Sequence, residues 1–412
     1  MSKRVKILNY IQLLRSPAAF MLAGRFMQLM SQMAMVLVVP KVLVPGLYVQ
    51  LNLVLPLAFL GVSLVFGWMN NAIHRHVFEL LGSGGRHFRQ TVFYYYGIVC
   101  LFLFLIVLIG QYYTDSIYRL VPLLLAAAAL KAGILGILNT SGKSIGFFFS
   151  NVGFASSLLL FVLLCFIDSG NNLQRNLVVY ASFDIVVAII SWSLLGIFKV
   201  PPIPRYYKDI AKSYFHYGLP LVAKMVGIWV ISISDRYFLT IWEEPQEIAS
   251  YILSYQLAGS AITIPMSFVM AVIFPKILKI EKDFNQREAL VFTYKMLGYY
   301  LRLMLPVFIL VSVIILLFQY YIYTNYEFNP IIVVTIVLAH VIFELSHFYN
   351  KEFELNGRTL MITKAVALGA MVNVVLNLAL IPSFGSLGAA VATLFAYAVA
   401  VYMVARKREY QP

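Results

Sequence analysis

The stretch MVGIWVISISDRYFLTIWEEP, residues 225–245, combines two properties that conflict with each other. From Met225 to Trp242 it is almost wholly apolar, yet Asp235 and Arg236 stand side by side within it. A helix needs about 20 apolar residues to cross the hydrocarbon core of a bilayer. This stretch therefore predicts a membrane helix whose charges require a partner or a polar cavity.

Similar apolar runs recur along the whole chain. Of the 412 residues, 61% are hydrophobic and 12% are charged, and the mean hydropathy is +0.85. A soluble protein of this length could not bury so much apolar surface. We predict an all-α polytopic membrane protein with about twelve transmembrane helices, at residues 17–38, 48–69, 92–110, 117–138, 146–167, 177–198, 215–242, 248–274, 297–319, 330–350, 360–381 and 385–404.

Basic residues are distributed unequally between the two sides that these spans define. The side that holds both termini receives most of them, including those of the 70–91 and 276–295 loops. The opposite side receives only Lys41, Arg119 and Arg175. Because short loops rich in Lys and Arg stay in the cytoplasm, both termini are expected to be cytoplasmic. The net charge of +14 is then mainly a topology signal, and we do not expect nucleic-acid binding.

The two halves of the chain resemble each other weakly. GLYVQLNLVLPLAF near 46–59 and ASYILSYQLAGSAI near 249–262 each open the second helix of a half. Parallel repeats of this kind are typical of transporters with two lobes around a central cavity. The predicted organisation is an N-terminal six-helix lobe, a basic cytoplasmic linker and a C-terminal six-helix lobe, at residues 1–198, 199–214 and 215–412.

Within the spans, cations outnumber acids. The cations are Arg25, Lys131, Lys224, Arg236, Arg302 and Lys364, and the acids are Asp184, Asp235 and Glu344. A charged side chain near the middle of a bilayer costs about 2.5–3.5 kcal/mol on insertion scales, so it usually faces a partner or a cavity. Arg25 and Lys224 lie deep in the first helix of each half, and we predict that they line an aqueous, cationic cavity.

Polar side chains accompany these cations at helical spacing. Gln28 and Gln32 share a face with Arg25, and Gln256 begins a polar stripe on the eighth helix. The predicted substrate-binding residues are Arg25, Lys224, Arg236, Gln28, Gln32, Asn52, Gln256 and Arg302. Polar stripes also hold helices together in lipid, and this alternative stays open for the uncharged residues.

Three interpretations compete for Asp235 and Arg236. They pair with neighbours near the outer end of the helix, or Arg236 contacts a phosphate, or Asp235 binds H⁺ or Na⁺ and couples transport to an ion gradient. Glu344 is a second candidate for ion coupling, and its expected partner is Lys364 or Arg302. We expect no catalytic residue, no metal site and no cofactor other than a coupling ion.

Three segments carry a resemblance to a known family, and one of them, LYVQLNLVLPLAFLGVSLVFGWMNNAIHRHV, resembles its second helix. SDRYFLTIW…EIASYILSYQLAG resembles the seventh and eighth helices of the polysaccharide-unit (O-antigen or capsule repeat, Wzx-type) flippases of the multidrug/oligosaccharidyl-lipid/polysaccharide exporter superfamily. NVVLNLALIPSFGSLGAAVATLFAYAVAV, residues 373–401, resembles their last hairpin. The resemblance implies a protein of the bacterial inner membrane that flips undecaprenyl-diphosphate-linked oligosaccharides to the outer leaflet. Its implied partners are that lipid, the bilayer and proteins of polysaccharide polymerisation and assembly.

Other functions stay open. The lipid II flippases are similar but commonly have fourteen spans, and the ion-coupled multidrug antiporters of the same superfamily carry mostly cations, which a surplus of buried positive charge disfavours. A scaffold that transports nothing predicts that no charge in the cavity matters.

Overall fold

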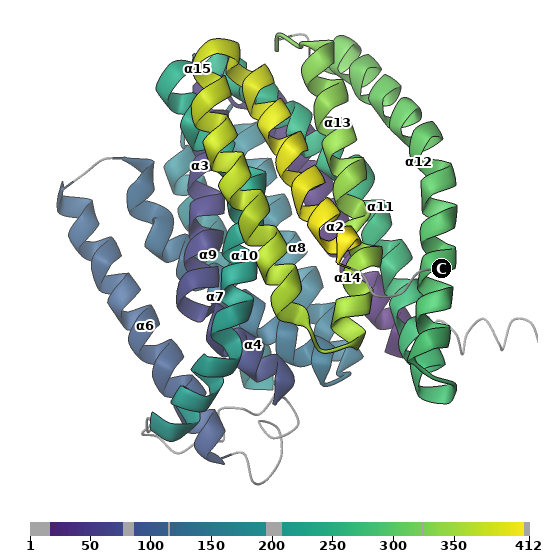
Figure 1. Ribbon diagram of the computed structural model, residues 1–412. Coiled ribbons are helices and arrows are strands. Elements are labelled where there is room, and N and C mark those ends of the chain that lie inside the picture. Colours follow the sequence, from purple (N-terminus) through teal and green to yellow (C-terminus); the bar gives the residue numbers. More distant parts are fainter. Residues whose placement is uncertain (1–16, 77–85, 114–115, 195–207, 324, 408–412) are drawn as a thin grey trace, which may run out of the picture. The chain divides into compact units, whose positions relative to one another are not determined.

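All regular structure in the part of the chain that the structure describes is helical. The computed structural model describes residues 17–76, 86–113, 116–194, 208–323 and 325–407 (Figure 1). The basic residues near the N-terminus and most of the predicted 199–214 linker lie outside these ranges. The helices are α2 (Pro17–Val42), α3 (Pro45–Gly61), the π-helical turn η1 (Val62–Phe66), α4 (Gly67–Arg75), α6 (Arg86–Tyr113), the 3-10 turn η3 (Ile117–Leu120), α7 (Val121–Thr140), α8 (Ser144–Ile167), α9 (Leu173–Leu194), α10 (Lys208–Trp242), α11 (Pro245–Asp283), α12 (Gln286–Ile322), α13 (Pro330–Glu344), α14 (Ser346–Leu355) and α15 (Thr359–Arg406).

Eleven helical segments among the described residues are long and apolar enough to cross a membrane. The last of them, α15, has 48 residues, which at 1.5 Å per residue is far longer than a bilayer requires. Its backbone leaves the helical region at Gly385, so α15 provides two crossings. The prediction of an all-α polytopic membrane protein with about twelve spans is confirmed.

The break in α15 depends on a glycine. Gly385 has φ 53° and ψ −134°, a conformation that residues with a Cβ atom rarely adopt. The arms on either side fold back on each other, because a Cβ at Gly369 would lie 2.9 Å from the carbonyl oxygen of Ala396. Figure 1 shows the two arms side by side next to α13. The segment 373–401 is thus a helical hairpin, as the sequence predicted.

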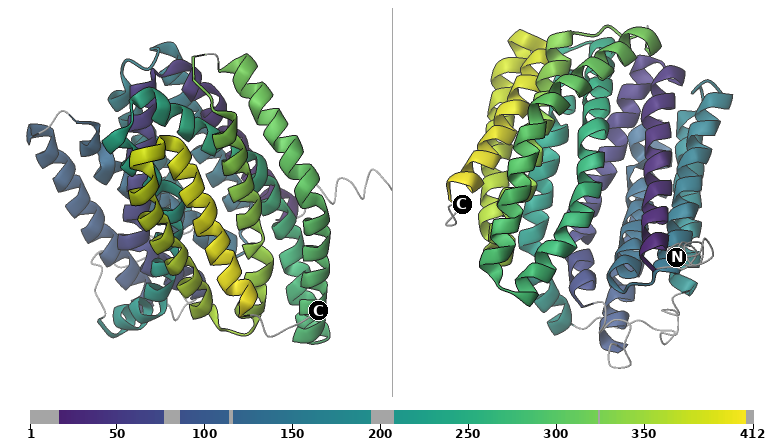
Figure 2. Two further views of the ribbon diagram at one scale, coloured as in Figure 1. Left: turned by 45° about the horizontal axis from the view of Figure 1, so that its top comes forward. Right: turned by 90° about the vertical axis from the view of Figure 1, so that its right-hand side faces the viewer.

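The chain divides into two compact units, which meet at Val222 and Ala223 within α10. In unit 1, the residues up to Val222, α2 packs along α8 (purple and blue in Figure 2), α3 packs on α7, and α7 packs on α9. The first part of α10 also belongs to this unit, where the ring of Phe215 lies 5.6 Å from that of Trp68.

Unit 2, from Ala223 onward, repeats this order of packing. Its second helix, α11, packs on α13, and α13 packs on α15. The remainder of α10 lies against the first arm of α15, since a Cβ at Gly227 would lie 2.7 Å from Val366 Cγ1. The turns between the fourth and fifth helices are also alike, because Gly142 and Gly357 have φ values of 69° and 68°. The same plan is therefore built twice from sequences with little identity, and the division into two six-helix lobes stays a prediction.

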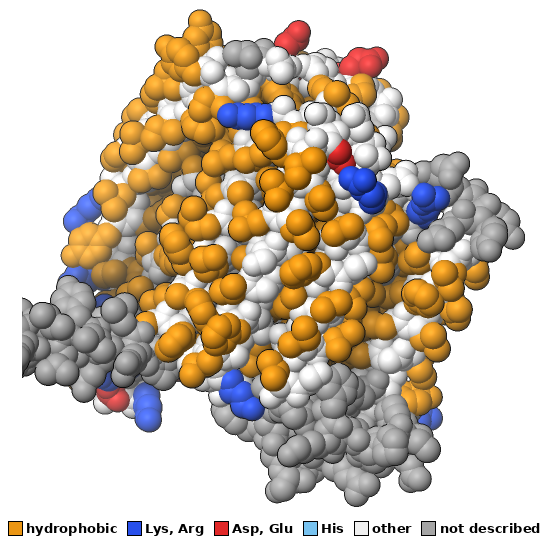
Figure 3. Space-filling view, turned by 180° about the vertical axis from the view of Figure 1, so that it is seen from behind, with side chains coloured by type: hydrophobic (Ala, Val, Ile, Leu, Met, Phe, Trp, Pro, Cys, Tyr) orange, Lys and Arg blue, Asp and Glu red, His pale blue; other side chains and the backbone are white. Residues whose placement is uncertain are grey.

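The surface of the helices suits a lipid environment. Large apolar side chains are exposed along α6 and α12, among them Leu101, Phe104, Leu303 and Leu305. In the face that Figure 3 shows, hydrophobic side chains cover most of the described surface, and charged side chains are few. In water such a surface would aggregate, whereas in hydrocarbon it costs nothing. The protein is a multi-pass membrane protein.

The hairpin in α15 should depend on Gly385 more than on any ordinary helical glycine. Gly385→Ala forces a Cβ into a backbone conformation with positive φ and should destabilise the fold by about 1–3 kcal/mol. Gly298→Ala in α12 is the matched control, because no atom lies within 4 Å of its added Cβ. The midpoint of thermal unfolding in detergent measures both variants. Equal midpoints for the two variants would contradict this account of the hairpin.

Candidate functional site

One of the fully buried charged residues of unit 2 is Asp235 in α10, whose side chain is 0% exposed. The hydroxyl of Tyr251, from α11, donates a hydrogen bond to its carboxylate. The backbone N–H of Arg236 donates to Oδ1 at 2.8 Å, and Thr393 Oγ1, from the second arm of α15, lies 3.4 Å from Oδ2. Asp235 is therefore held where three helices meet, and its charge is solvated by donors rather than by water.

Two asparagines extend this cluster along the first arm of α15. Asn373 Oδ1 accepts hydrogen bonds from Ser234 Oγ at 3.2 Å and from Asn377 Nδ2 at 3.0 Å. Asn373 Nδ2 lies 3.5 Å from Thr393 Oγ1. Both asparagines are fully buried, and Asn377 Oδ1 has no hydrogen-bond partner. The cluster thus gathers a carboxylate and amide oxygens, which are ligands that suit a proton or a hard cation.

Arg236 is also buried, but it faces a different set of neighbours. Its guanidinium lies 5.4 Å from the centre of the Tyr255 ring, which favours a cation–π contact. Its Nε atom is buried without a hydrogen-bond partner. Tyr255 and Tyr397 share a hydrogen bond of 3.0 Å, and the ring of His340 packs on Tyr255. In the described part of the chain no ion pair joins the side chains of Arg236 and Asp235, and the link between the two residues is the backbone N–H of Arg236.

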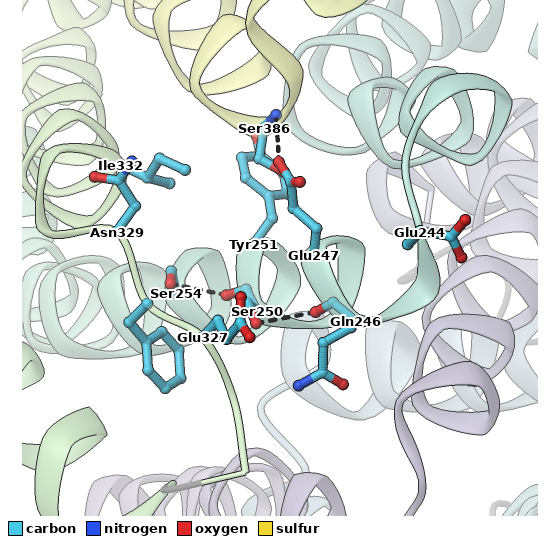
Figure 4. A pocket seen from close by; sticks show the side chains of 11 residues that line it. Glu244, Gln246, Glu247, Ser250, Tyr251, Ser254, Glu327, Asn329, Ile332 and Ser386 are labelled. Atoms are coloured by element: carbon cyan, nitrogen blue, oxygen red, sulfur yellow. Dashed lines mark hydrogen bonds between the residues drawn. The ribbon is translucent and has the colours of Figure 1, made fainter.

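A cavity of about 540 Å³ lies at the end of unit 2 where α11 and α13 begin (Figure 4). Its lining includes three carboxylates, those of Glu244, Glu247 and Glu327. Tyr251 lines the same cavity, and its hydroxyl is the one that bonds to Asp235. One side chain therefore connects an acidic cavity at the helix ends with the buried Asp235.

The carboxyl groups of Glu243, which follows α10, and of Glu247, in the first turn of α11, lie together beside this cavity. Glu247 Oε1 accepts a hydrogen bond of 3.2 Å from the backbone N–H of Ser386, at the start of the second arm of α15 (Figure 4). Partial burial, together with the hydrogen bond and negative charge of Glu247, raises the pKa of Glu243 to about 7. The pair therefore holds a shared proton near neutral pH.

Glu344 lies in a third polar cluster of unit 2. It is 0% exposed, accepts a hydrogen bond of 2.7 Å from Thr263, and has its Oε2 atom 3.2 Å from His347 Nε2. The expected partners, Lys364 and Arg302, make no ion pair with it among the described residues. The expected pairing rested on similar depth in the membrane. Depth does not specify the rotation of a helix about its axis, and that rotation decides which way a side chain points.

The principal buried ion pair of unit 1 joins Lys131 and Asp184. Lys131 Nζ lies 3.1 Å from Asp184 Oδ2, and the two side chains are 19% and 2% exposed. Ser157 donates a further hydrogen bond to Asp184, and the ammonium group lies 4.8 Å from the centre of the Phe154 ring. Lys131 is therefore neutralised by the carboxylate of Asp184.

The candidate residues of the first two helices have different surroundings. Arg25 is exposed, and its Nη2 donates to Asn139 Oδ1 at 3.3 Å. Gln28 is half-buried and Gln32 is exposed. Asn52 is buried, and its Nδ2 donates to the carbonyl oxygen of Tyr48 in its own helix. That bond gives Asn52 a structural role.

In the later helices the predicted residues also differ in exposure. Lys224 and Gln256 are half-buried, and Arg302 is exposed with its guanidinium 5.8 Å from the Tyr299 ring. Neither Arg25 nor Lys224 makes an ion pair with a carboxylate in the described part of the chain. Sequence reasoning missed Tyr251, Asn373, Asn377 and Thr393 as site residues. The one-turn spacing of the asparagines was visible, but their neighbours are distant in the sequence.

The fold matches those of solved lipid flippases and drug transporters. A lipid II flippase, MurJ, in an inward closed conformation shares 16% identity with a TM-score of 0.64, over 96% of this chain and 88% of that chain. An outward-facing multidrug resistance MATE family transporter of the MOP superfamily shares 14% identity with a TM-score of 0.59, over 96% of each chain. The MATE transporter ClbM in complex with Rb⁺ shares 15% identity with a TM-score of 0.54, over 96% of this chain and 94% of that chain.

No family model and no curated protein sequence matches the chain. At identities of 14–16% the likeness shows the fold alone, which this chain shares with these solved proteins. These structural neighbours are transporters and flippases rather than enzymes.

The carboxyl pair predicts a pH dependence of stability. Because the pKa of Glu243 rises from 4.5 to about 7 on folding, the folded state binds more protons than the unfolded state between these values. Stability should therefore fall as pH rises from 4.5 to 7, and Glu243→Gln should reduce that fall.

The measurement is the midpoint of thermal unfolding across this pH range. Glu244→Gln removes one charge from the same cavity without touching the pair and is the control. If Glu244→Gln but not Glu243→Gln reduced the change of the unfolding midpoint with pH, the assignment to Glu243 would be wrong.

Proposed function

We propose that this protein flips an undecaprenyl-diphosphate-linked oligosaccharide, an O-antigen or similar polysaccharide repeat unit, from the cytoplasmic to the outer leaflet of the bacterial inner membrane. The observation that carries the proposal is the state of Arg25 and Lys224. Lys131 has a carboxylate at 3.1 Å, whereas these two cations of the membrane region have none among the described residues. Cations without carboxylates are available to an anionic ligand.

The diphosphate supplies the negatively charged partner that these two cations lack among the described residues. A bare diphosphate would lose its hydration on crossing hydrocarbon, which is very costly for an ion. Arg25 and Lys224 replace that hydration with charge-assisted hydrogen bonds, and Arg binds phosphate in a bidentate manner. Gln28, Gln32 and Gln256 provide amides for the sugar hydroxyls, while the prenyl chain stays in lipid. Arg236 and Arg302 stay candidates for later contacts along the path.

The fold is consistent with this mechanism. One structural neighbour is named a lipid II flippase, so a chain with this fold can act on a lipid-linked substrate. Two lobes that rock around a central cavity move the substrate without breaking a bond. In this proposal both termini are cytoplasmic, and proteins of polysaccharide polymerisation receive the product.

We assign ion coupling to Asp235. Tyr251 and Thr393 bring hydroxyl oxygens to its carboxylate, Asn373 contacts Thr393 beside it, and the acidic cavity beside Tyr251 attracts cations. The bound species is H⁺ or Na⁺, since both suit a site built from oxygens. Glu344 stays a second candidate, because its carboxylate lies beside His347.

The alternative is an ion-coupled multidrug antiporter, and the likeness to MATE transporters favours it. Such a protein binds an organic cation, so acids rather than cations should determine its affinity for substrate. A lipid II flippase differs only in the glycan carried. The mass of a bound lipid distinguishes both from the proposed function.

Removing either cation should abolish retention of the substrate. Native mass spectrometry of the protein purified from cells that make polysaccharide should show a bound polyprenyl-diphosphate saccharide. Arg25→Ala and Lys224→Ala should each reduce the bound fraction about tenfold or more, because each removes charge-assisted hydrogen bonds. Lys351→Ala is the control, since Lys351 already pairs with Glu354. Equal retention in all variants would refute the assignment of Arg25 and Lys224.

Asp235 should affect coupling but not retention. In proteoliposomes, imposed Na⁺ and pH gradients should each be tested for acceleration of transport, and Asp235→Asn should abolish the response to the effective one. The same variant should still retain the lipid-linked saccharide, because the carboxylate of Asp235 contacts neither Arg25 nor Lys224 in the described structure. A variant with full gradient response would exclude Asp235 as the coupling site.

A further inference from the structure

A second cavity lies in unit 1, where α3, α7 and α9 begin. Its volume is about 600 Å³, and its rim is rich in polar side chains. The polar residues that line it are Gln50, Arg119, Asn171, Asn172, Gln174 and Arg175. The cavity thus combines two guanidinium groups with four side-chain amides, and no acidic residue lines it.

Neighbouring side chains hold the two guanidinium groups in place. Arg119 Nη2 donates to Gln174 Oε1 at 2.8 Å, and Arg175 Nη2 lies 3.1 Å from Asp168 Oδ2. Asp168 also accepts hydrogen bonds from the Gly170 N–H at 3.0 Å and from Asn176 Nδ2 at 3.1 Å. Asp168 is therefore occupied by donors from its own turn and from the start of α9. Even after subtraction of its charge, the cavity keeps a net positive charge.

The backbone adds to this positive potential. The α9 helix begins at Leu173 on the wall of the cavity. The first N–H groups of a helix have no acceptor within the helix and lie at the positive end of its dipole. Anions bind in such positions when cationic side chains converge on them.

Membrane topology does not explain this arrangement. Arg119 and Arg175 are two of the three basic residues predicted on the outer side, the third being Lys41. Basic residues are depleted on that side, yet these two share one cavity. Two rare charges that converge on a single polar cavity indicate a ligand of opposite charge.

The corresponding cavity of unit 2 shows that the helix arrangement alone does not impose this charge. It too lies where the second, fourth and sixth helices of its unit begin, since α11, α13 and the second arm of α15 contribute to it. Its charged residues are Glu244, Glu247 and Glu327. Equivalent positions in the two units therefore carry opposite charges.

We propose that the cavity of unit 1 binds an oxyanion, the carboxylate of an acidic sugar or a phosphate, at the outer end of the unit. Arg119 and Arg175 bind the charge, and the amides of Gln50, Asn171 and Asn172 hydrogen-bond to the hydroxyl groups beside it. The site stands on its own geometry, so it goes beyond the proposed function and does not require it.

The test uses the full-length protein in phosphatidylcholine nanodiscs. Isothermal titration with glucuronate, and with glucose as the neutral control, measures binding of the sugar carboxylate. Arg119→Gln and Arg175→Gln should each weaken glucuronate binding about tenfold, because each removes a charge-assisted hydrogen bond. Lys41→Gln is the matched control, as it removes the same charge from the same side outside the cavity.

A second arm identifies the source of the oxyanion. Native mass spectrometry from phosphatidylglycerol nanodiscs counts retained lipids in the same variants. Loss of glucuronate binding in the two cavity variants alone supports a glycan site, and loss of retained phosphatidylglycerol in those variants alone supports a lipid phosphate site. Arg119→Lys keeps the charge and should retain part of the binding, which separates loss of ligand from loss of fold.

If the cavity variants bind both anions as the Lys41→Gln control does, the proposal is wrong. Wild-type protein that binds neither anion overturns it equally. Either result leaves the measurements on Arg25 and Lys224 unchanged, so the failure of this site and the failure of the proposed function are distinguishable.

Discussion

A bilayer supplies no water to a buried polar group, and this constraint organises the interior of unit 2. Asp235 has to obtain every hydrogen bond from protein, and its donors come from α10, α11 and α15. Each of these bonds fixes the rotation of one helix about its axis. The same carboxylate that serves as a candidate ion site thus holds three helices in register, which ties the packing of the unit to the state of that site.

Local patterns predicted the spans, because hydropathy and turn residues act within one helix length. The end of α10 at Trp242, the start of α11 at Pro245 and the turn at Gly385 all lie within a few residues of the expected boundaries. The partners of the charges were harder to predict. Glu344 contacts His347 and Thr263, and the asparagines of α15 meet α10, because helix rotation and packing decide which side chains touch.

The count of charged residues in the sequence predicted more cations than acids within the spans. It did not predict which cations would have no carboxylate beside them. Lys131 and Arg25 are both basic residues of apolar helices, yet only Lys131 lies beside a carboxylate among the described residues. The difference depends on α9, which brings Asp184 to α7 from a distant part of the chain. A candidate binding residue is therefore better identified by the neighbours it lacks than by its depth in the membrane.

The cavities at the helix starts of the two units carry opposite charges. Both arise where equivalent helices begin, so the repeated plan provides the geometry and the residues on the rim provide the charge. The acidic cavity reaches Asp235 through Tyr251, whereas the basic cavity has no such link, because Lys131 and Ser157, which contact Asp184, do not line it. Asp184 is already neutralised by its lysine. The acidic cavity of unit 2 therefore attracts cations, and the basic cavity of unit 1 attracts anions. The proposed function would use these separate cavities of opposite charge for a coupling ion and for an anionic group.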